Sequence, residues 1–231
     1  MINEWNESVF PVQDRLDTIS KYQCDYELYG YSPRSLGWDK GKQDIRFYIL
    51  THFFSLKGKR ILDIGCGFGD INKCLQEQYG DDYVYLGIDL VESFIREARA
   101  RYSSDKVSFR CCDFISDWHS LGEFDVILAS GIFNHKFTKA DNKRFIFEVI
   151  KKSLALAAEG VAFDFLSDKV DFMHTHTYHS SPEEVLSLGY SLTRNVVLRN
   201  DYFPFEFAIR LLKDDSFSVD DTTFNSWKEI K

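Results

Sequence analysis

Short runs of β-branched and aromatic residues alternate along this chain with longer stretches in which apolar residues recur at helical spacing. This alternation is typical of a parallel sheet whose strands are joined by crossover helices. Strands are predicted, in order, at residues 60–64, 83–89, 107–111, 124–130 and 160–166. Connecting helices are predicted at residues 70–79, 91–102 and 141–157. The pattern therefore favours a doubly wound α/β core.

The segments on either side of this core carry patterns of their own. Residues 181–189 begin with Ser-Pro, continue with two glutamates and end in Gly, which is a typical helix start and stop. Strand-like runs follow at 192–200 and 204–213. Ahead of the first strand, residues 41–56 have apolar positions near helical spacing and predict a helix that could cap a cleft.

A chain of 231 residues is long enough for one sizeable core, and α/β folds of this length commonly form one domain. We expect a helical cap or lid over residues 1–57 and the core over 58–213. Residues 214–231 are rich in Asp, Ser and Thr and are expected to form a polar, loosely held tail.

Composition and charge narrow the range of partners. The formal charge of −8 and the isoelectric point near 5.3 argue against a broad phosphate-binding surface, so we expect no nucleic-acid partner. No apolar run approaches the length that spans a bilayer, and the N-terminus lacks a basic segment followed by an apolar one. Five cysteines, without CxxC spacing, suggest neither a disulfide framework nor a zinc site. A cytoplasmic protein without a membrane partner is expected.

A glycine-rich turn follows the first predicted strand. In the stretch ILDIGCGFGD, Asp63 lies in the strand, and Gly65, Gly67 and Gly69 precede the next helix. The carboxyl ends of strands are where open α/β sheets bind ligands, and glycines let ligand atoms approach the backbone. The dinucleotide fingerprint would require a glycine where Asp70 stands, and a carboxylate disfavours a pyrophosphate there. The turn therefore favours a cationic or zwitterionic ligand over NAD.

Two further carboxylates follow the next two predicted strands. Asp89 ends the second strand, 22 residues after Gly67, where it could accept hydrogen bonds from both hydroxyls of a ribose. Asp113 lies just past the third strand and precedes Phe114 and Ile115, so it could meet an adenine amine between apolar faces. The ordered set predicts an adenosyl ligand.

These motifs closely resemble those of the class I S-adenosylmethionine-dependent methyltransferases. ILDIGCGFGD is similar to their first motif, YLGIDL to their ribose-binding acidic motif and CCDF to their adenine-binding motif. The resemblance covers about residues 34–213. It implies a Rossmann-like, doubly wound, seven-stranded, mostly parallel sheet with an antiparallel last strand at 204–213 and an N-terminal helical extension. It also implies S-adenosyl-L-methionine as cofactor, S-adenosyl-L-homocysteine as product, and donor binding by Asp63, Gly65, Cys66, Gly67, Gly69, Asp89, Leu90, Asp113, Phe114 and Ser130.

Within that family the chain is most similar to a group of bacterial small-molecule methyltransferases, through RSLGWDKGKQDIRF, ASGIFNH, GVAFDFLSD and LRNDYFPFEFAIRLL. SGIF stands where nucleic-acid amino-methyltransferases carry an Asn/Asp-Pro-Pro-aromatic motif, which further disfavours DNA or RNA. We expect methylation of an oxygen or nitrogen of a small polar metabolite, such as a sugar or a natural-product precursor. The alternatives are a non-catalytic protein that binds the adenosyl ligand as a sensor or assembly partner, and a nicotinamide-dependent enzyme.

Two histidines are candidate catalytic residues. His135 lies just beyond the fourth predicted strand and could receive the proton of an acceptor hydroxyl; it could equally be a loop or capping histidine. In HTHTYH, Tyr178 and His179 could contact substrate, with His179 as a second catalytic candidate. His174 and His176 would share one face of an extended strand, but no carboxylate or thiol completes a metal site, and a solvated loop is the alternative.

Other polar and aromatic residues have open roles. Arg46 could hold the methionine carboxylate of the donor, with Trp38 as a lid over the site; alternatively Arg46 is an exposed helix residue and Trp38 packs on the core. Arg199 and Tyr202 could bind the acceptor, although aromatic runs beside strands are more often core. Asp164 lies in an apolar strand, where a carboxylate needs a partner.

Overall fold

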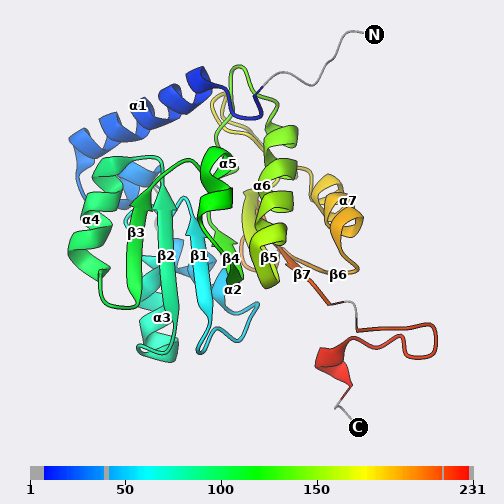
Figure 1. Cartoon of the computed structure of the whole chain (residues 1–231). Helices are drawn as coiled ribbons and strands as arrows, with labels where there is room; N and C mark the ends of the chain where they lie inside the picture. The colour runs from blue at the N-terminus through cyan, green and yellow to red at the C-terminus, as the bar shows by residue number, and fades with distance from the viewer. Residues whose placement is uncertain (1–7, 39–41, 215, 229–231) are drawn as a thin grey trace.

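A computed structural model describes residues 8–38, 42–214 and 216–228 of the chain. One seven-stranded sheet forms the centre of the molecule, with helices on both faces (Figure 1). Its strands are β1 (Arg60–Ile64), β2 (Val84–Asp89), β3 (Val107–Cys111), β4 (Phe124–Ala129), β5 (Ala157–Leu166), β6 (Asn195–Arg199) and β7 (Glu206–Leu212). The spatial order is β3-β2-β1-β4-β5-β7-β6, and β7 is antiparallel to both its neighbours. The predicted Rossmann-like sheet with an antiparallel last strand is confirmed.

Helices connect these strands and precede them. They are α1 (Val12–Tyr29), α2 (Gln43–Thr51), α3 (Ile71–Tyr79), α4 (Glu92–Tyr102), α5 (Phe114–Asp117), α6 (Asn142–Leu156) and α7 (Pro182–Leu192), with short 3-10 turns η1 (Pro33–Leu36), η2 (Trp118–Ser120) and η3 (Asn225–Trp227). The helix predicted at 181–189 continues beyond Gly189, because this glycine lies inside α7. A Cβ there would come within 2.9 Å of Leu211, so the missing side chain lets α7 pack closely on the sheet.

Several predicted boundaries differ from those observed. The fifth strand begins at residue 157 rather than 160, and the sixth at 195 rather than 192. The helix predicted at 41–56 spans only Gln43–Thr51. The ends of helices and strands are set by local capping and by strand pairing, and hydrophobic periodicity contains little information about either.

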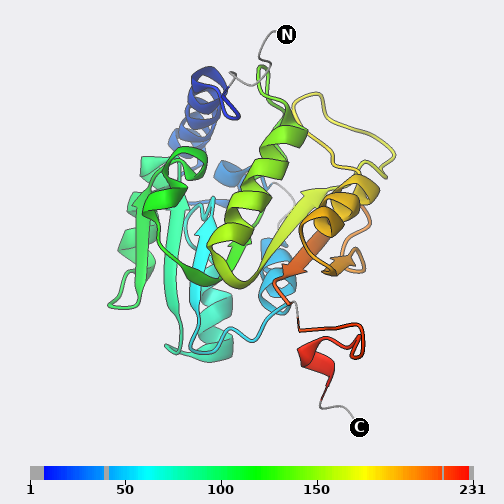
Figure 2. The same cartoon turned by 45° about the vertical axis from the view of Figure 1, so that its right-hand side comes forward.

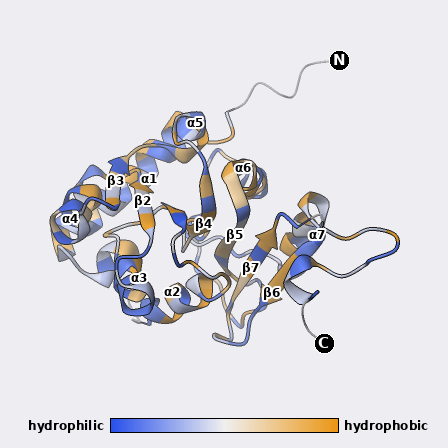
Figure 3. Ribbon diagram, turned by 60° about the horizontal axis from the view of Figure 1, so that its bottom comes forward, coloured by the Kyte–Doolittle hydropathy of each residue, from blue (hydrophilic) through white to orange (hydrophobic). Residues whose placement is uncertain are grey.

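Alternation along the strands divides the apolar side chains between two cores. Ile61 belongs to the cluster under α2, α3 and α4, whereas its neighbour Leu62 belongs to the cluster under α5, α6 and α7. Figure 2 shows α6 along one face of the sheet with α2 and α3 on the other. In Figure 3 hydrophobic positions follow β4, β5 and β7 between the helices. Burial of both faces explains why the strands read as nearly continuous apolar runs.

Two outlying parts complete the described chain. Helix α1 crosses the molecule at the carboxyl-end edge of the sheet, at the upper left of Figure 1. Residues 216–228 follow β7 and hold a local turn in which the Ser216 hydroxyl accepts a hydrogen bond from the Asn225 amide at 2.9 Å. The predicted cap and tail also include residues 1–7, 39–41, 215 and 229–231, which lie outside the described residues. No helix within the described ranges is long and apolar enough to cross a membrane.

Candidate ligand-binding site

The glycine-rich turn after β1 is bare for two physical reasons. Gly65, Gly67 and Gly69 all have positive φ, at 69°, 54° and 76°, a region that L side chains rarely adopt. In addition, a Cβ on Gly65 would lie 2.3 Å from the side chain of Ile132, and one on Gly67 would lie 2.9 Å from that of Leu36. A side chain at either position would therefore collide with a wall of the adjoining pocket.

This pocket opens at the carboxyl-end edge of the sheet, and its space of about 1120 Å³ includes open solvent at the mouth. Of the residues predicted to bind the donor, its lining includes Asp63, Gly65, Cys66, Gly67, Asp89, Leu90, Asp113, Phe114 and Ser130. Gly69 and Arg46 are absent from the lining, and Gly69 packs beside the ring of Phe109. The sequence thus located most of one continuous surface, assembled from the ends of four strands.

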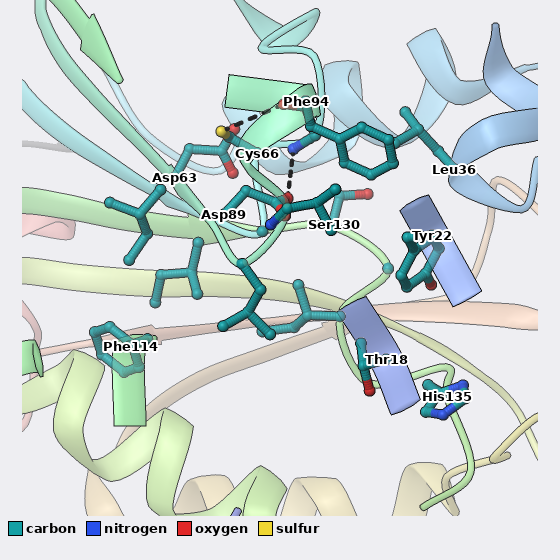
Figure 4. A pocket seen from close by; sticks show the side chains of 18 of the residues that line it. Thr18, Tyr22, Leu36, Asp63, Cys66, Asp89, Phe94, Phe114, Ser130 and His135 are labelled. Atoms are coloured by element: carbon teal, nitrogen blue, oxygen red, sulfur yellow. Dashed lines mark hydrogen bonds between the residues drawn. The ribbon is translucent and has the colours of Figure 1, made fainter. Parts of the chain in front are cut away.

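Asp89 ties the second strand to the glycine turn. Its Oδ2 accepts a hydrogen bond from the Gly67 amide and its Oδ1 accepts one from the Val91 amide, each at 2.9 Å. Figure 4 shows Asp89 in the pocket beside Cys66 of the glycine turn. Burial raises the pKa of this carboxyl, and the amide hydrogen bonds oppose that rise. Each oxygen keeps a lone pair for a second donor, so the fixed carboxylate can still accept hydrogen bonds from a ligand.

Asp63 lies deeper, at the base of the pocket. Its carboxylate is almost fully buried and accepts a hydrogen bond from the Tyr85 hydroxyl at 2.7 Å. The pKa of Asp63 is raised to about 7, because burial and the charges of Asp89 and Asp164 outweigh the lowering effect of the Tyr85 hydroxyl. This position can therefore hold either a carboxylate or a neutral acid near neutral pH.

Asp113 forms the opposite end of the pocket. It caps α5 by accepting a hydrogen bond from the Ile115 amide at 2.9 Å, and it also accepts from the Ser116 hydroxyl. Its Oδ2 pairs with the guanidinium of Arg15 on α1 at 3.0 Å. Phe114, the next residue, supplies an apolar wall beside it. Asp113 is thus more fully engaged by the protein than Asp89.

Helix α1 covers the pocket and lies within the segment expected to form a cap or lid, but the sequence analysis did not single out its residues. Thr18 and Tyr22 face the cavity from this helix (Figure 4). One turn earlier, the buried Asp14 accepts hydrogen bonds from the backbone amides of residues 138–140, at distances of 2.5 to 3.2 Å. Burial alone would raise the pKa of Asp14, but these hydrogen bonds outweigh it and hold the pKa below its usual value. The available sequence signal is Pro11 followed by an acidic first turn.

The buried carboxylate of Asp164 finds its hydrogen-bond donors in the turn after β4. Its Oδ2 accepts a hydrogen bond from the Ser130 hydroxyl at 2.5 Å, and its Oδ1 accepts one from the Gly131 amide at 2.6 Å. Burial raises the pKa of Asp164 to about 6, against the opposing charge of Arg46 and these hydrogen bonds. Asp164 therefore fixes the Ser130–Gly131 turn at the pocket wall.

Arg46 and Trp38 form a connected pair. The expectation that Arg46 is an exposed helix residue is wrong, because only 5% of it is exposed. Its guanidinium stacks 3.4 Å from the centroid of the Trp38 ring and makes a two-pronged ion pair with Glu206, with Nε 2.5 Å from Oε2. Trp38 lines the pocket, against the backbone of Gly131, whereas Arg46 stands behind it. The fork that was expected to bind the donor is already occupied by Glu206.

His135 lines the pocket and His179 does not. Burial, together with the charge of Lys21, lowers the pKa of His135, which favours the neutral imidazole at neutral pH. Both ring nitrogens of His179 have partners outside the pocket, the Ser167 carbonyl at 2.7 Å and the Thr177 hydroxyl at 3.1 Å. The structure brings only one of the two candidate catalytic histidines to the cavity.

The predicted acceptor residues also lie away from the pocket lining. Arg199 pairs with the exposed Asp201 at 2.6 Å, and the Tyr178 amide bonds to the loop after β4. The Tyr202 hydroxyl is buried without a hydrogen-bond partner in the described residues, and its pKa is raised by burial. Over the same residues, no group of three or more His, Cys, Asp or Glu side chains is arranged to hold a metal ion.

Comparisons with known proteins agree with this geometry. A family model described as a methyltransferase domain matches residues 61–160. A malonyl-[acyl-carrier protein] O-methyltransferase from Acetivibrio thermocellus is 32% identical over 73 residues, 32% of this chain and 25% of that protein. A ubiquinone biosynthesis O-methyltransferase from Coxiella burnetii is 27% identical over 93 residues, 39% of this chain and 38% of that protein. The matches thus span between a quarter and two fifths of these relatives.

Solved structures share the fold over most of the chain. The magnesium protoporphyrin IX methyltransferase of Synechocystis PCC 6803 with bound S-adenosylmethionine superposes with a TM-score of 0.61 at 14% identity, covering 87% of this chain and 98% of that one. The DhpI complex with S-adenosylhomocysteine gives a TM-score of 0.59 at 17% identity, covering 88% and 97%. At these identities the likeness concerns the fold.

Proposed function

The chain belongs to the class I S-adenosylmethionine-dependent methyltransferases, and we propose that it transfers a methyl group from S-adenosylmethionine to an oxygen or nitrogen of a small polar metabolite. One observation carries the proposal: the bare turn at Gly65 and Gly67, the fixed carboxylate of Asp89 and the apolar end at Phe114 line a single pocket. These residues fit an adenosyl ligand. The Asp89 carboxylate matches the ribose hydroxyls, Phe114 matches the apolar face of the adenine, and the glycine turn lets the ligand approach the backbone closely.

The residues of the pocket divide the ligand between them. Asp89 accepts hydrogen bonds from the ribose hydroxyls, and Asp113 with Phe114 holds the adenine end. The glycine turn leaves room for the methionine part, and Asp63 at its base offers a carboxylate to positive charge. Arg46 has no part in this set, because Glu206 and Trp38 occupy its guanidinium.

The sulfonium of the donor supplies an already activated methyl group, so the protein contributes alignment and exclusion of water. Tyr22, Leu36 and Trp38 close the pocket from the N-terminal side. His135 accepts the proton of a hydroxyl acceptor at a ring nitrogen, for which its lowered pKa keeps it in the neutral form. An amine acceptor needs no such base before transfer if it binds unprotonated.

The net charge of the chain and the names of its relatives support this class of acceptor. A net charge of −8 disfavours a nucleic acid and favours a small molecule. The two relatives described above are named as O-methyltransferases, which supports oxygen ahead of nitrogen.

Calorimetry with S-adenosylmethionine and S-adenosylhomocysteine tests the donor half of the proposal, and we expect binding of both. If neither ligand binds, the donor half of the proposal is wrong. Labelled methyl donor and a panel of nucleotide sugars, phenols and small amines then test the acceptor half. Turnover of labelled methyl groups with an extract of the source cells would reject the alternative of a non-catalytic sensor, whereas binding without any turnover would favour that alternative.

A further inference from the structure

The base of the pocket carries negative charge that the protein leaves unbalanced. The hydrogen-bond partner of Asp63 is the Tyr85 hydroxyl, and those of Asp89 are two backbone amides, so every partner is neutral. Asp113, in contrast, lines the same pocket but pairs with the cationic Arg15. The uncompensated carboxylates therefore gather at one end of the cavity, beside the glycine turn.

Other groups around Asp63 strengthen this imbalance. The Tyr85 hydroxyl bonds to it, and the ionisable groups whose charges interact with it are Asp89 at the end of β2, Cys66 in the glycine turn and Asp164 on β5. None of these side chains is cationic, and Arg46, whose charge acts on Asp164, is already paired with Glu206. Two like charges that share a poorly hydrated site raise each other's cost of ionisation, and a cation brought beside them lowers it.

Resting on the proposed function, we propose that Asp63 makes the pocket select the cationic methyl donor over its neutral product. The donor carries a permanent positive charge at sulfur, and the product, a thioether, carries none. The two ligands otherwise share the same adenosyl and amino-acid groups. Charge at the base of the pocket therefore distinguishes them even without direct contact, since Coulomb attraction extends beyond contact distance in a buried site.

A proton accompanies this selection. Burial and the neighbouring carboxylates raise the pKa of Asp63 to about 7, so a neutral acid and a carboxylate coexist in the empty pocket near neutral pH. Binding of the sulfonium favours the carboxylate, so the acid's proton leaves to solvent as the donor binds. The thioether product shares the ammonium group of the donor but lacks the sulfonium, so it pulls less on this proton. Transfer of the methyl group thus removes the charge that held the donor, which promotes release of the product.

Titration calorimetry with both ligands across about pH 5.5 to 7.5 tests this inference. For the unchanged protein, we expect donor affinity to rise about tenfold over this range, since each unit of pKa depression on binding corresponds to a tenfold preference. Product affinity should change much less. Runs in two buffers of different ionisation heat count the released protons directly, and the donor should release more protons than the product.

Three variants separate the charge of Asp63 from its other roles. Asp63→Asn keeps an oxygen that can accept from Tyr85 but removes the charge, so the donor's advantage over the product and its pH dependence should both disappear. Tyr85→Phe removes the hydroxyl that lowers the pKa of Asp63, so the donor's pH dependence should move to higher pH. Asp113→Asn is the matched control, because its charge is already paired with Arg15, and it should weaken both ligands alike.

The outcomes distinguish the inference from the proposed function. If neither ligand binds the unchanged protein, the proposed function itself fails. If both bind but Asp63→Asn keeps the same affinity ratio and pH dependence, the inference is overturned while the function stands. Should Asp63→Asn not fold, as judged by circular dichroism, the direction of the Tyr85→Phe shift decides. An analogue with an ammonium in place of the sulfonium should behave like the donor; behaviour like the product would overturn the inference.

Discussion

The guanidinium of Arg46 on α2 grips the carboxylate of Glu206 on β7, 160 positions further along the chain. Both side chains are largely buried, at 6% and 13% exposure. The pair joins the segment before β1 to the far side of the sheet, and it holds Trp38 against the turn at Gly131. One long-range contact thus builds a wall of the pocket.

Breaking this pair should destabilise the protein strongly. Arg46→Gln leaves the Glu206 carboxylate buried without its partner, and we expect a loss of about 3 to 5 kcal/mol in the free energy of unfolding. Urea unfolding measures this loss. Replacing both members with apolar residues, as in Arg46→Met with Glu206→Leu, should cost less than the single change. The exposed pair of Arg199 with Asp201 is the control, and Arg199→Gln should cost at most about 1 kcal/mol.

Glycine at position 65 should be indispensable for ligand binding. Gly65 and Gly122 both have positive φ, so alanine at either carries a similar backbone strain of about 1 kcal/mol. Only at Gly65 does the new Cβ meet another side chain, that of Ile132. Gly65→Ala should therefore lower donor affinity by about tenfold or more, because a displaced turn misplaces the ligand. Gly122→Ala should leave calorimetric affinity unchanged; equal losses in both variants would point to general unfolding.

Asp89→Ala should weaken the binding of both adenosyl ligands by about 1 to 3 kcal/mol, the cost of leaving buried ribose hydroxyls unpaired. The variant also frees the amides of Gly67 and Val91, so the turn itself should exchange its amide hydrogens faster. Calorimetry and hydrogen exchange measure the two effects. Faster amide exchange with unchanged affinity for the adenosyl ligands would show that Asp89 fixes the glycine turn but does not bind the ligand.

The anchor of α1 should respond to acid. Because amide hydrogen bonds hold the pKa of Asp14 below its value in the unfolded chain, its stabilisation is complete above that unfolded value, near 3.9. The stabilisation is lost as pH falls through the lower folded value. Asp14→Asn should therefore cost about 1 to 3 kcal/mol at neutral pH and flatten the acid branch of the unfolding curve. Asp17→Asn, on the exposed side of the same helix, should change neither.

His135→Gln should slow methyl transfer to a hydroxyl acceptor by about 10² to 10⁴-fold without loss of donor affinity. The pKa of His135 is lowered from 6.5, so in the unchanged protein the rate should fall as pH drops below that lowered value. Rates with an acceptor from the screen measure both effects. His174→Gln removes an exposed imidazole as the matched control, and an equal loss there would argue against a base at position 135.

The parts of the fold that repeat a local pattern could be predicted from the sequence. β1 and β4 are buried on both faces, so their apolar runs stand out, and the glycine turn with Asp89 has a fixed spacing along the chain. Helix α1 has no such pattern. Asp14 is its buried residue, so no apolar stripe marks it, and its anchors lie more than 120 positions away.

The same reasoning explains the misplaced site residues. The Arg46 guanidinium can bind a carboxylate, which is why it was expected to bind that of the donor. Only the folded chain shows that it already binds the carboxylate of Glu206. The chain beside His179 is close to the pocket, because Thr177 forms a β-bridge with the pocket residue His135. The His179 ring, however, bonds to Thr177 and to the Ser167 carbonyl and not to the pocket. The sequence pattern located the end of the pocket at the glycine turn because the motifs there are contiguous. The opposite end is assembled from loops with no fixed spacing.

Two neighbouring residues of α1 reach in different directions: Asp14 to the loop after β4 and Arg15 to Asp113 after β3. A single helical turn consequently bridges the two halves of the sheet. Thr18 and Tyr22 of the same helix line the pocket, so a displacement of this turn would free the pocket wall from both halves of the sheet at once.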